Sequence, residues 1–134
     1  MGDRANFVFV QPNGETIVLY SHWGGHQMLA NLAEAVAKAQ SRWSDPSYAT
    51  RIAISQMIGD GWAFETGWGI NVNSIGDNEH KIPVIDWEQM TFSLHEEDSF
   101  HNLDNKVRGM KNEAIFTQDL RSFVEKYSDV PILV

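Results

Sequence analysis

The sequence predicts an α+β fold: a mostly antiparallel five-stranded sheet, with two helices inserted after its first hairpin and a third helix near the C-terminal end. Apolar, β-branched runs bounded by turn residues occur at the start and in the second half of the chain. Two stretches with helical spacing of apolar residues lie between them. A length of 134 residues is typical of one domain, so residues 1–134 are expected to form a single domain.

The first two strands are predicted to form a hairpin. The runs 7–10 and 16–20 are apolar, and Asn13 and Gly14 between them favour the positive φ angles of a tight turn. Neither run alternates apolar with polar residues. We therefore expect both faces of the hairpin to be buried, one by helices and the other by a second layer or a partner subunit.

Two helices are predicted to follow the hairpin. The first spans residues 25–43, where apolar residues recur at helical spacing and Trp43 ends the pattern. In the second, Asp45 is the expected N-cap and Pro46 the first helical residue. This helix runs to about residue 58, where Gly59 is expected to stop it.

The second half of the chain is expected to contribute three strands and a helix. The strands fall at residues 66–72, 81–86 and 90–95, and the last two form a second hairpin. Pro83 indicates an edge strand or a bulge. Residues 96–112 are polar and are expected to form a long loop with at most a short helix. A last helix is predicted from Thr117, with four apolar residues on one face: Leu120, Phe123, Val124 and Tyr127.

Composition argues against several classes of function. Ten Lys and Arg against eighteen Asp and Glu give a net charge of −8, which disfavours nucleic-acid binding and docking on an anionic membrane. The absence of cysteine excludes disulfides, thiol nucleophiles and zinc sites with sulfur ligands. Neither a signal peptide nor a membrane-spanning run is visible in the sequence, so a cytoplasmic protein is expected.

The junction at residues 20–26 contains the richest set of functional groups. Gly24 and Gly25 precede the predicted helix, whose N-terminal N–H groups and dipole favour an anion. Ser21, His22 and His26 would add hydrogen-bond donors. Trp23 or Tyr20 would stack on a flat ring. The structural alternative is a strand-to-helix turn that requires glycine for its backbone angles.

Three other segments are candidates for the same site. Arg51, in the middle of the second predicted helix, either clamps an anionic group or forms a structural ion pair. Gly67 and Gly69 would lie on one face of a strand and leave a groove beside Trp68. The structural alternative is that the aromatic side chains of this segment serve only in ordinary core or interface packing. The turn with Asp77 and Asn78 either approaches the ligand or is a capped polar turn.

Catalysis is the main alternative to binding. The spacing of His22 and His26 and the acids and imidazole of the turn 77–80 permit a hydrolase using His22, His26, Asp77 and His80, with or without a metal. Two glycines between the first two histidines make helical spacing doubtful there. The sequence contains no Gly-x-Ser-x-Gly elbow, phosphate loop or dinucleotide fingerprint, so neither cofactor nor metal is expected.

Four motifs together resemble a group of small uncharacterised proteins of bacteria and tailed phages. They are Tyr20-Ser21-His22-Trp23-Gly24-Gly25, Arg42-Trp43-Ser44-Asp45 leading to Tyr48 and Arg51-Ile52, Thr66-Gly67-Trp68-Gly69-Ile70, and Gly76-Asp77-Asn78-Glu79. The resemblance covers about residues 5–95. It implies a free-standing cytoplasmic, phage-borne protein, and it implies no activity, cofactor or catalytic residue.

These observations together predict a non-enzymatic protein that binds an anionic, ring-bearing small molecule. A nucleotide or nucleotide-derived signal is the best candidate, and a phage-borne version would sequester a host immune nucleotide. The expected ligand-binding residues are Ser21, His22, Trp23, Gly24, Gly25, His26, Arg51, Gly67, Trp68, Gly69, Asp77 and Asn78. A third possibility is a protein-interaction module, in which the apolar hairpin and residues 132–134 form the interface. A homodimer is expected.

Overall fold

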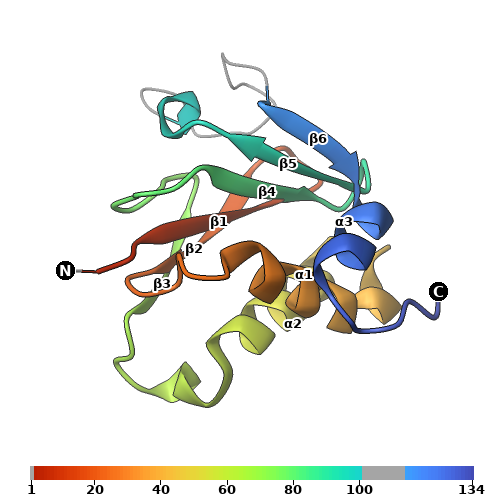
Figure 1. Cartoon of the computed structure of the whole chain (residues 1–134), viewed down its shortest axis with the longest axis horizontal. Coiled ribbons are helices and arrows are strands. Elements are labelled where there is room, and N and C mark those ends of the chain that lie inside the picture. The colour runs from red at the N-terminus through yellow and green to blue at the C-terminus, as the bar shows by residue number, and fades with distance from the viewer. Residues whose placement is uncertain (1, 101–113) are drawn as a thin grey trace.

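The computed structural model describes residues 2–100 and 114–134 and shows an α+β fold built on a six-stranded mixed sheet, in the order β3-β2-β1-β4-β5-β6 (Figure 1). Three α-helices lie on one face of the sheet. The strands are β1 (Ala5–Val10), β2 (Thr16–Ser21), β3 (Trp68–Val72), β4 (Ile82–Asp86), β5 (Thr91–His95) and β6 (Phe116–Asp119). The helices are α1 (Met28–Lys38), α2 (Pro46–Ile58) and α3 (Leu120–Tyr127).

The predicted five-stranded, mostly antiparallel sheet is therefore only partly right. The α+β class is confirmed, but the sheet has a sixth strand, β6, and it joins β1 to β4 in parallel. The other pairings among the described strands are antiparallel. None of the described helices is long and apolar enough to cross a membrane.

The N-terminal hairpin is confirmed, and its register assigns each residue to a face of the sheet. Phe7 pairs with Leu19 and Val8 with Val18, so alternate residues of each strand point to opposite faces. All six residues of β1 are buried. The expectation that both faces of the hairpin are covered is therefore correct for its central strand.

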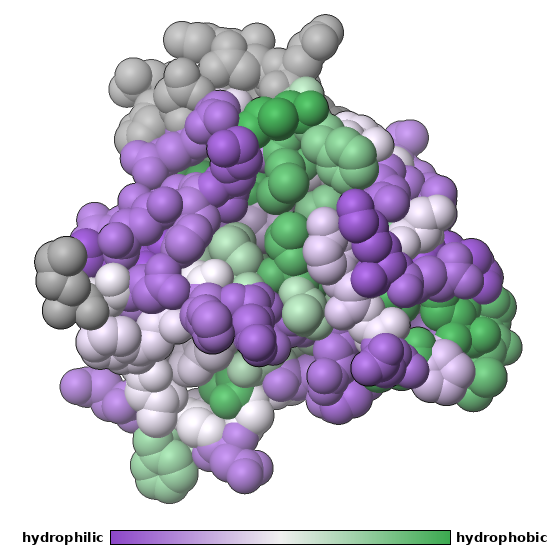
Figure 2. All heavy atoms as spheres, viewed as in Figure 1, coloured by the Kyte–Doolittle hydropathy of each residue, from purple (hydrophilic) through white to green (hydrophobic). Residues whose placement is uncertain are grey.

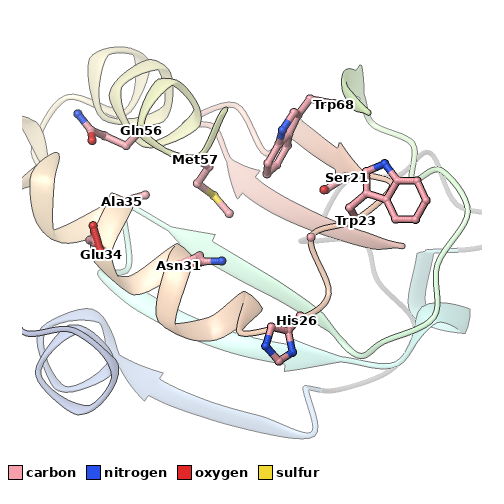
Figure 3. A pocket seen from close by; sticks show the side chains of 10 residues that line it. Ser21, Trp23, His26, Asn31, Glu34, Ala35, Gln56, Met57 and Trp68 are labelled. Atoms are coloured by element: carbon pink, nitrogen blue, oxygen red, sulfur yellow. The ribbon is translucent and has the colours of Figure 1, made fainter. Parts of the chain in front are cut away.

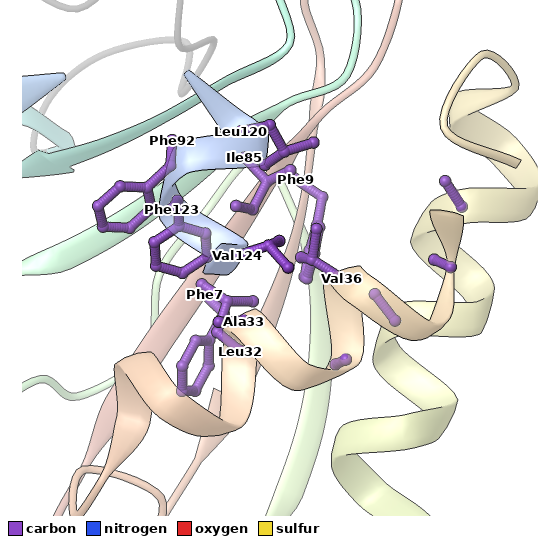
Figure 4. Close-up of a cluster of buried hydrophobic side chains, with 14 of the residues drawn as sticks. Phe7, Phe9, Leu32, Ala33, Val36, Ile85, Phe92, Leu120, Phe123 and Val124 are labelled. Carbon is purple, nitrogen blue, oxygen red and sulfur yellow. The ribbon is translucent and has the colours of Figure 1, made fainter. Parts of the chain in front are cut away.

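The larger core lies between the sheet and the helices. Phe7 and Phe9 of β1 point down onto α1, and α3 closes the other side with Phe123 and Val124 (Figure 4). The rings of Phe92 and Phe123 stack with centroids 3.9 Å apart and an interplanar angle of 9°. Burying one such side chain contributes about 1.5–3 kcal/mol, which makes this cluster the main source of stability.

The opposite face of the sheet has a smaller core of its own. Its buried members on the strands are Val8, Val10, Val18, Ile82 and Val84. Phe100 covers them from a short 3₁₀ helix at Glu97–Phe100, and Ile75 packs against them from the segment before β4. Connecting segments thus pack on this small core, and a partner subunit on this face stays a prediction.

The two predicted helices after the hairpin exist, but the first is shorter at both ends than the predicted residues 25–43. α1 begins at Met28 because Gln27 has a left-handed φ of 55°, which is incompatible with helix before that point. It ends at Lys38 and a 3₁₀ turn follows at Gln40–Arg42. α2 runs from Pro46 to Ile58 and stops at Gly59, as predicted, although the Asp45 side chain makes no capping hydrogen bond.

The second half of the chain contains two corrections. Pro83 does not mark an edge, because β4 lies in the middle of the sheet; its pairing with β1 starts at Val84, so the proline precedes that ladder. The segment from Phe116 to Asp119 is strand β6, and α3 starts at Leu120, later than the predicted Thr117. Most of the loop predicted at residues 96–112 lies outside the described residues, which leave out 101–113.

Candidate functional site

A pocket of about 330 Å³ lies where the ends of β2 and α2 meet the start of α1 and β3. Its lining contains two indoles, and we call it the tryptophan pocket. The lining residues are Ser21, Trp23, Gly24, His26, Asn31, Glu34, Ala35, Gln56, Met57 and Trp68. Five of them belong to the site predicted from the sequence: Ser21, Trp23, Gly24, His26 and Trp68.

Side chains from four elements converge on this pocket. In Figure 3, Trp68 of β3 and Met57 of α2 point toward the space in front of α1, and Asn31 of α1 points into it from the other side. Ser21 pairs with Trp68 across the strands, so both side chains lie on the helix face of the sheet. Ser21 is only 2% exposed, and its hydroxyl forms part of the pocket wall.

Gly24 is required by a close approach of the chain to Ser21. A Cβ at position 24 would lie 2.5 Å from the Ser21 hydroxyl oxygen and 2.7 Å from its Cβ. Any larger residue would displace Ser21 or the turn. The first glycine of the predicted anion cradle thus shapes the pocket through its small size.

The second glycine does not present a free N–H to a ligand. The Gly25 N–H donates to the backbone oxygen of Asp3 at 2.9 Å, and a Cβ there would clash with the side chains of Asp3 and His80. α1 starts only three residues later. The predicted anion cradle is therefore occupied by the protein's own N-terminal segment.

The electrostatics of the tryptophan pocket do not favour an anion. Its lining includes one carboxylate, Glu34, and neither a lysine nor an arginine. Glu34 also forms an ion pair with Lys38 at 3.1 Å, with both side chains about half exposed. The other hydrogen-bonding side chains of the lining carry amides, a hydroxyl, an imidazole and two indole N–H groups.

His22 supports the site from outside its lining. Its Nδ1 lies 3.2 Å from the Tyr20 hydroxyl, within hydrogen-bond distance, and its ring meets Trp23 edge-on with centroids 4.4 Å apart. The backbone N–H of His22 donates to the Gly67 carbonyl at 2.8 Å. His22 therefore positions Trp23 and joins two loops.

Arg51 lies outside the tryptophan pocket. It lines a separate pocket of about 320 Å³ between α2 and β3, together with Trp62 and Ile70. The α2 residues that reach the tryptophan pocket are Gln56 and Met57, more than one turn further along the helix. The expected cation of the site is thus part of a different cavity.

The predicted glycine groove is filled by aromatic side chains. A Cβ on Gly67 would lie 3.1 Å from Trp23 and 3.3 Å from His22, and Gly67 precedes β3 with a φ of 83°. Gly69 pairs with Tyr20 on the opposite face of the sheet from Trp68. Neither glycine lines the tryptophan pocket.

The turn containing Asp77 and Asn78 is held by the buried side chain of Asn6. The Asn6 amide donates to the Asp77 carbonyl at 3.0 Å and to Asn78 Oδ1 at 3.1 Å, and its oxygen accepts the Gly76 N–H at 2.9 Å. Asn6 points to the face opposite Phe7, away from the helices. These contacts are those of a structural turn.

Five lining residues were missed from the sequence: Asn31, Glu34, Ala35, Gln56 and Met57. Asn31, Glu34 and Ala35 are three and four positions apart on α1, so they share one side of that helix. Gln56 and Met57 lie in the last turn of α2. The only signal available in the sequence was their position on the sides of two consecutive predicted helices.

The histidines of the alternative hydrolase each have different neighbours. His26 lines the tryptophan pocket, His22 packs between Tyr20 and Trp23, and His80 forms a 2.5 Å contact with Asp3. Within residues 2–100 and 114–134, no group of three or more His, Asp or Glu side chains is arranged to hold a metal ion.

Comparison of the chain with family models, curated protein sequences and solved structures finds no match.

Proposed function

We propose that the protein is a non-enzymatic binding protein that holds a ring-bearing small molecule in the tryptophan pocket. The observation that supports this function is the convergence of Trp23, Trp68 and the buried Ser21 hydroxyl on one cavity. Its volume of about 330 Å³ lies at the small end of the range for ligand sites, which is roughly 300–1,000 Å³. Indoles provide stacking area, and amides and hydroxyls orient a ring by hydrogen bonds.

The lining favours an uncharged or cationic ring inside the pocket. A nucleobase fits this description, because amides such as those of Asn31 and Gln56 can both donate to and accept from its edge. In the absence of lysine or arginine in the lining, the phosphate of a nucleotide ligand would stay outside in solvent. A nucleoside or nucleotide-derived signal therefore remains the proposed ligand class, with its base as the recognised part. Sequestration of such a signal would require no catalytic residues.

Ligand titration tests this proposal. Adenosine, guanosine and their monophosphates are added to the wild-type protein and to two variants, Trp23→Ala and Trp62→Ala. Both indoles are more than half exposed, but only Trp23 lines the pocket. At 100 times its Kd, a ligand should stabilise the protein by about 2.7 kcal/mol. Stacking on an aromatic side chain contributes about 1–3 kcal/mol per base, so Trp23→Ala should weaken binding about tenfold and Trp62→Ala should not. No stabilisation by any of these compounds, or equal effects of both substitutions, would contradict the proposal.

A second candidate function is self-association through the free edge of β3. Four exposed apolar side chains gather on this strand and the segment before it: Trp62 (54%), Phe64 (74%), Ile70 (48%) and Val72 (60%). β3 is the last strand of the sheet on this side, and residues 68–72 include no charge that would oppose pairing. Light scattering tests the expected homodimer, and Ile70→Lys should make a dimer dissociate. A monomer at high protein concentration would contradict it.

A further inference from the structure

An apolar groove separates the first turn of α1 from the end of α3. It has a volume of about 780 Å³, and we call it the α1–α3 groove. Its lining residues are Gly25, Gln27, Met28, Leu29, Ala30, Glu79, His80, Lys81, Leu94 and Tyr127. No residue is shared with the tryptophan pocket, so the two cavities are separate sites.

The apolar surface of the groove continues toward the edge of the sheet. Leu94 of β5 pairs with Phe116 of β6, and Phe116 is 43% exposed. Figure 2 shows hydrophobic surface running from the region of β6 down the middle of this face, with hydrophilic surface on both sides. An elongated apolar strip of this kind is suited to a chain-like ligand.

The acidic and basic side chains of the groove all belong to residues 79–81. Lys81 pairs with Glu96 at 3.8 Å, and their side chains are 55% and 58% exposed. Such a long, exposed ion pair is weak, so the ammonium group can bind another carboxylate. The Glu79 carboxylate already accepts the Arg4 N–H at 2.9 Å, and His80 contacts Asp3.

We propose that the α1–α3 groove binds an amphipathic carboxylate, with an aliphatic chain over Met28, Leu29 and Leu94 and its carboxylate on Lys81. The apolar lining provides the affinity, because each buried methylene strengthens binding about fourfold. The Lys81 ammonium selects the head group by charge. This inference does not depend on the function proposed for the tryptophan pocket.

Methionine methyl groups report on the two sites separately. Met28 lines the groove, Met57 lines the tryptophan pocket, and Met90 lines neither. The full-length protein is labelled with ¹³C at the methionine methyl groups and titrated with dodecanoate, dodecanol and dodecylamine, below the concentrations at which they form micelles. We expect dodecanoate to shift the Met28 signal and to leave Met57 and Met90 unchanged. A Met57 signal that fails to respond to nucleosides would count only against nucleoside binding in the tryptophan pocket.

Two substitutions test the chain and head-group contacts. Ala30→Glu places a carboxylate in the groove at an exposed helical position, and Ala63→Glu is the same change at an exposed position outside the groove. We expect Ala30→Glu to weaken dodecanoate binding at least tenfold and Ala63→Glu to have no effect. Lys81→Gln should reduce the affinity for dodecanoate several-fold, so that the variant binds dodecanoate no more tightly than it binds dodecanol. Lys38→Gln should leave the affinity for dodecanoate unchanged.

Several results would overturn the proposal. They are an unchanged Met28 signal, tighter binding of dodecylamine than of dodecanoate, or equal dodecanoate affinities of the wild type and Lys81→Gln. If an amphipathic helical peptide shifted Met28 and dodecanoate did not, the groove would be a protein-docking site.

Discussion

The Nε2 atom of His80 lies 2.5 Å from Oδ1 of Asp3, and this contact ties the turn before β4 to the segment before β1. Two backbone donors strengthen the connection: the Glu79 N–H donates to the Arg4 carbonyl at 3.0 Å, and the Arg4 N–H donates to Glu79 Oε1 at 2.9 Å. The polar turn that resembled an acid–base site in the sequence thus fixes the start of the sheet.

Asn6→Ala is expected to destabilise the protein by about 3 kcal/mol, because it removes the hydrogen bonds between the Asn6 side chain and the partly buried turn at residues 76–78, each worth about 1 kcal/mol. Asn6 itself is fully buried. Urea unfolding measures the change. Asn13→Ala is the control, since Asn13 is exposed and its Oδ1 accepts one hydrogen bond, from the Glu15 N–H. It should cost about 1 kcal/mol or less. Equal losses for the two variants would show that the Asn6 network is not important for stability.

Gly24→Ala is expected to abolish ligand binding in the tryptophan pocket, because the new methyl group would displace the Ser21 hydroxyl. The same titration of nucleosides and nucleotides measures the effect. Gly59→Ala is the control: its φ of +65° makes alanine strained there, but no atom lies within 4 Å of the added Cβ. This control should lower the melting temperature and leave affinity unchanged. Unaltered binding by Gly24→Ala would argue against the pocket as the site.

Acidification is expected to destabilise the protein through His95. Burial lowers the pKa of His95 below its ordinary value of 6.5, and its Nδ1 has no hydrogen-bond partner within residues 2–100 and 114–134. The unfolded chain therefore takes up a proton before the folded protein does, and stability falls as the pH drops below 6.5, until the pKa of the folded protein is reached. The loss is at most about 1.4 kcal/mol per pH unit. Unfolding of wild type and His95→Gln between pH 8 and 5 should show a steeper decline for the wild type; parallel curves would contradict this.

The carboxyl group of Asp119, before the first turn of α3, is expected to make a second pH-dependent contribution to stability. Hydrogen bonds from the Ser122 hydroxyl and N–H to Asp119 lower the pKa of this carboxyl below 3.8. Its stabilising effect is present above pH 3.8 and is lost as the pH falls through the pKa of the folded protein. Asp119→Ala should lower the melting temperature at pH 7 and have a smaller effect at pH 2. A loss of the same size at both pH values would show that ionisation of Asp119 is unimportant.

Local patterns were sufficient to predict the elements with strong periodicity or turn signals. The Asn13-Gly14 turn predicted the first hairpin, and Pro46 and Gly59 predicted both ends of α2. β6 was missed because it has four residues with one large apolar side chain, Phe116, and leads directly into α3. Its stability comes from pairing with β5, which is a tertiary contact and leaves no periodic pattern.

The candidate site was predicted mainly where its residues are close in sequence, and Trp68 is the one correctly predicted residue from a distant segment. Ser21, Trp23, Gly24 and His26 occupy one junction, and Trp68 pairs beside it. Arg51 was assigned to the same site because the sequence does not show which side of α2 faces the junction. The role of Gly25 was misjudged for a similar reason, since its N–H partner is Asp3, more than twenty residues away.

The parallel pairing of β1 with β4 divides the molecule into two sequential halves. β3, β2 and β1 belong to the first half of the chain, and β4, β5 and β6 to the second. In a fragment containing only one half, β1 or β4 would be an exposed edge, and both strands are almost entirely buried here. A cut between residues 73 and 81 would thus create two fragments, and the apolar strands β1 and β4 would pair where the fragments meet. Co-expression of two such fragments offers a route to a split form of the protein whose assembly could be followed in cells.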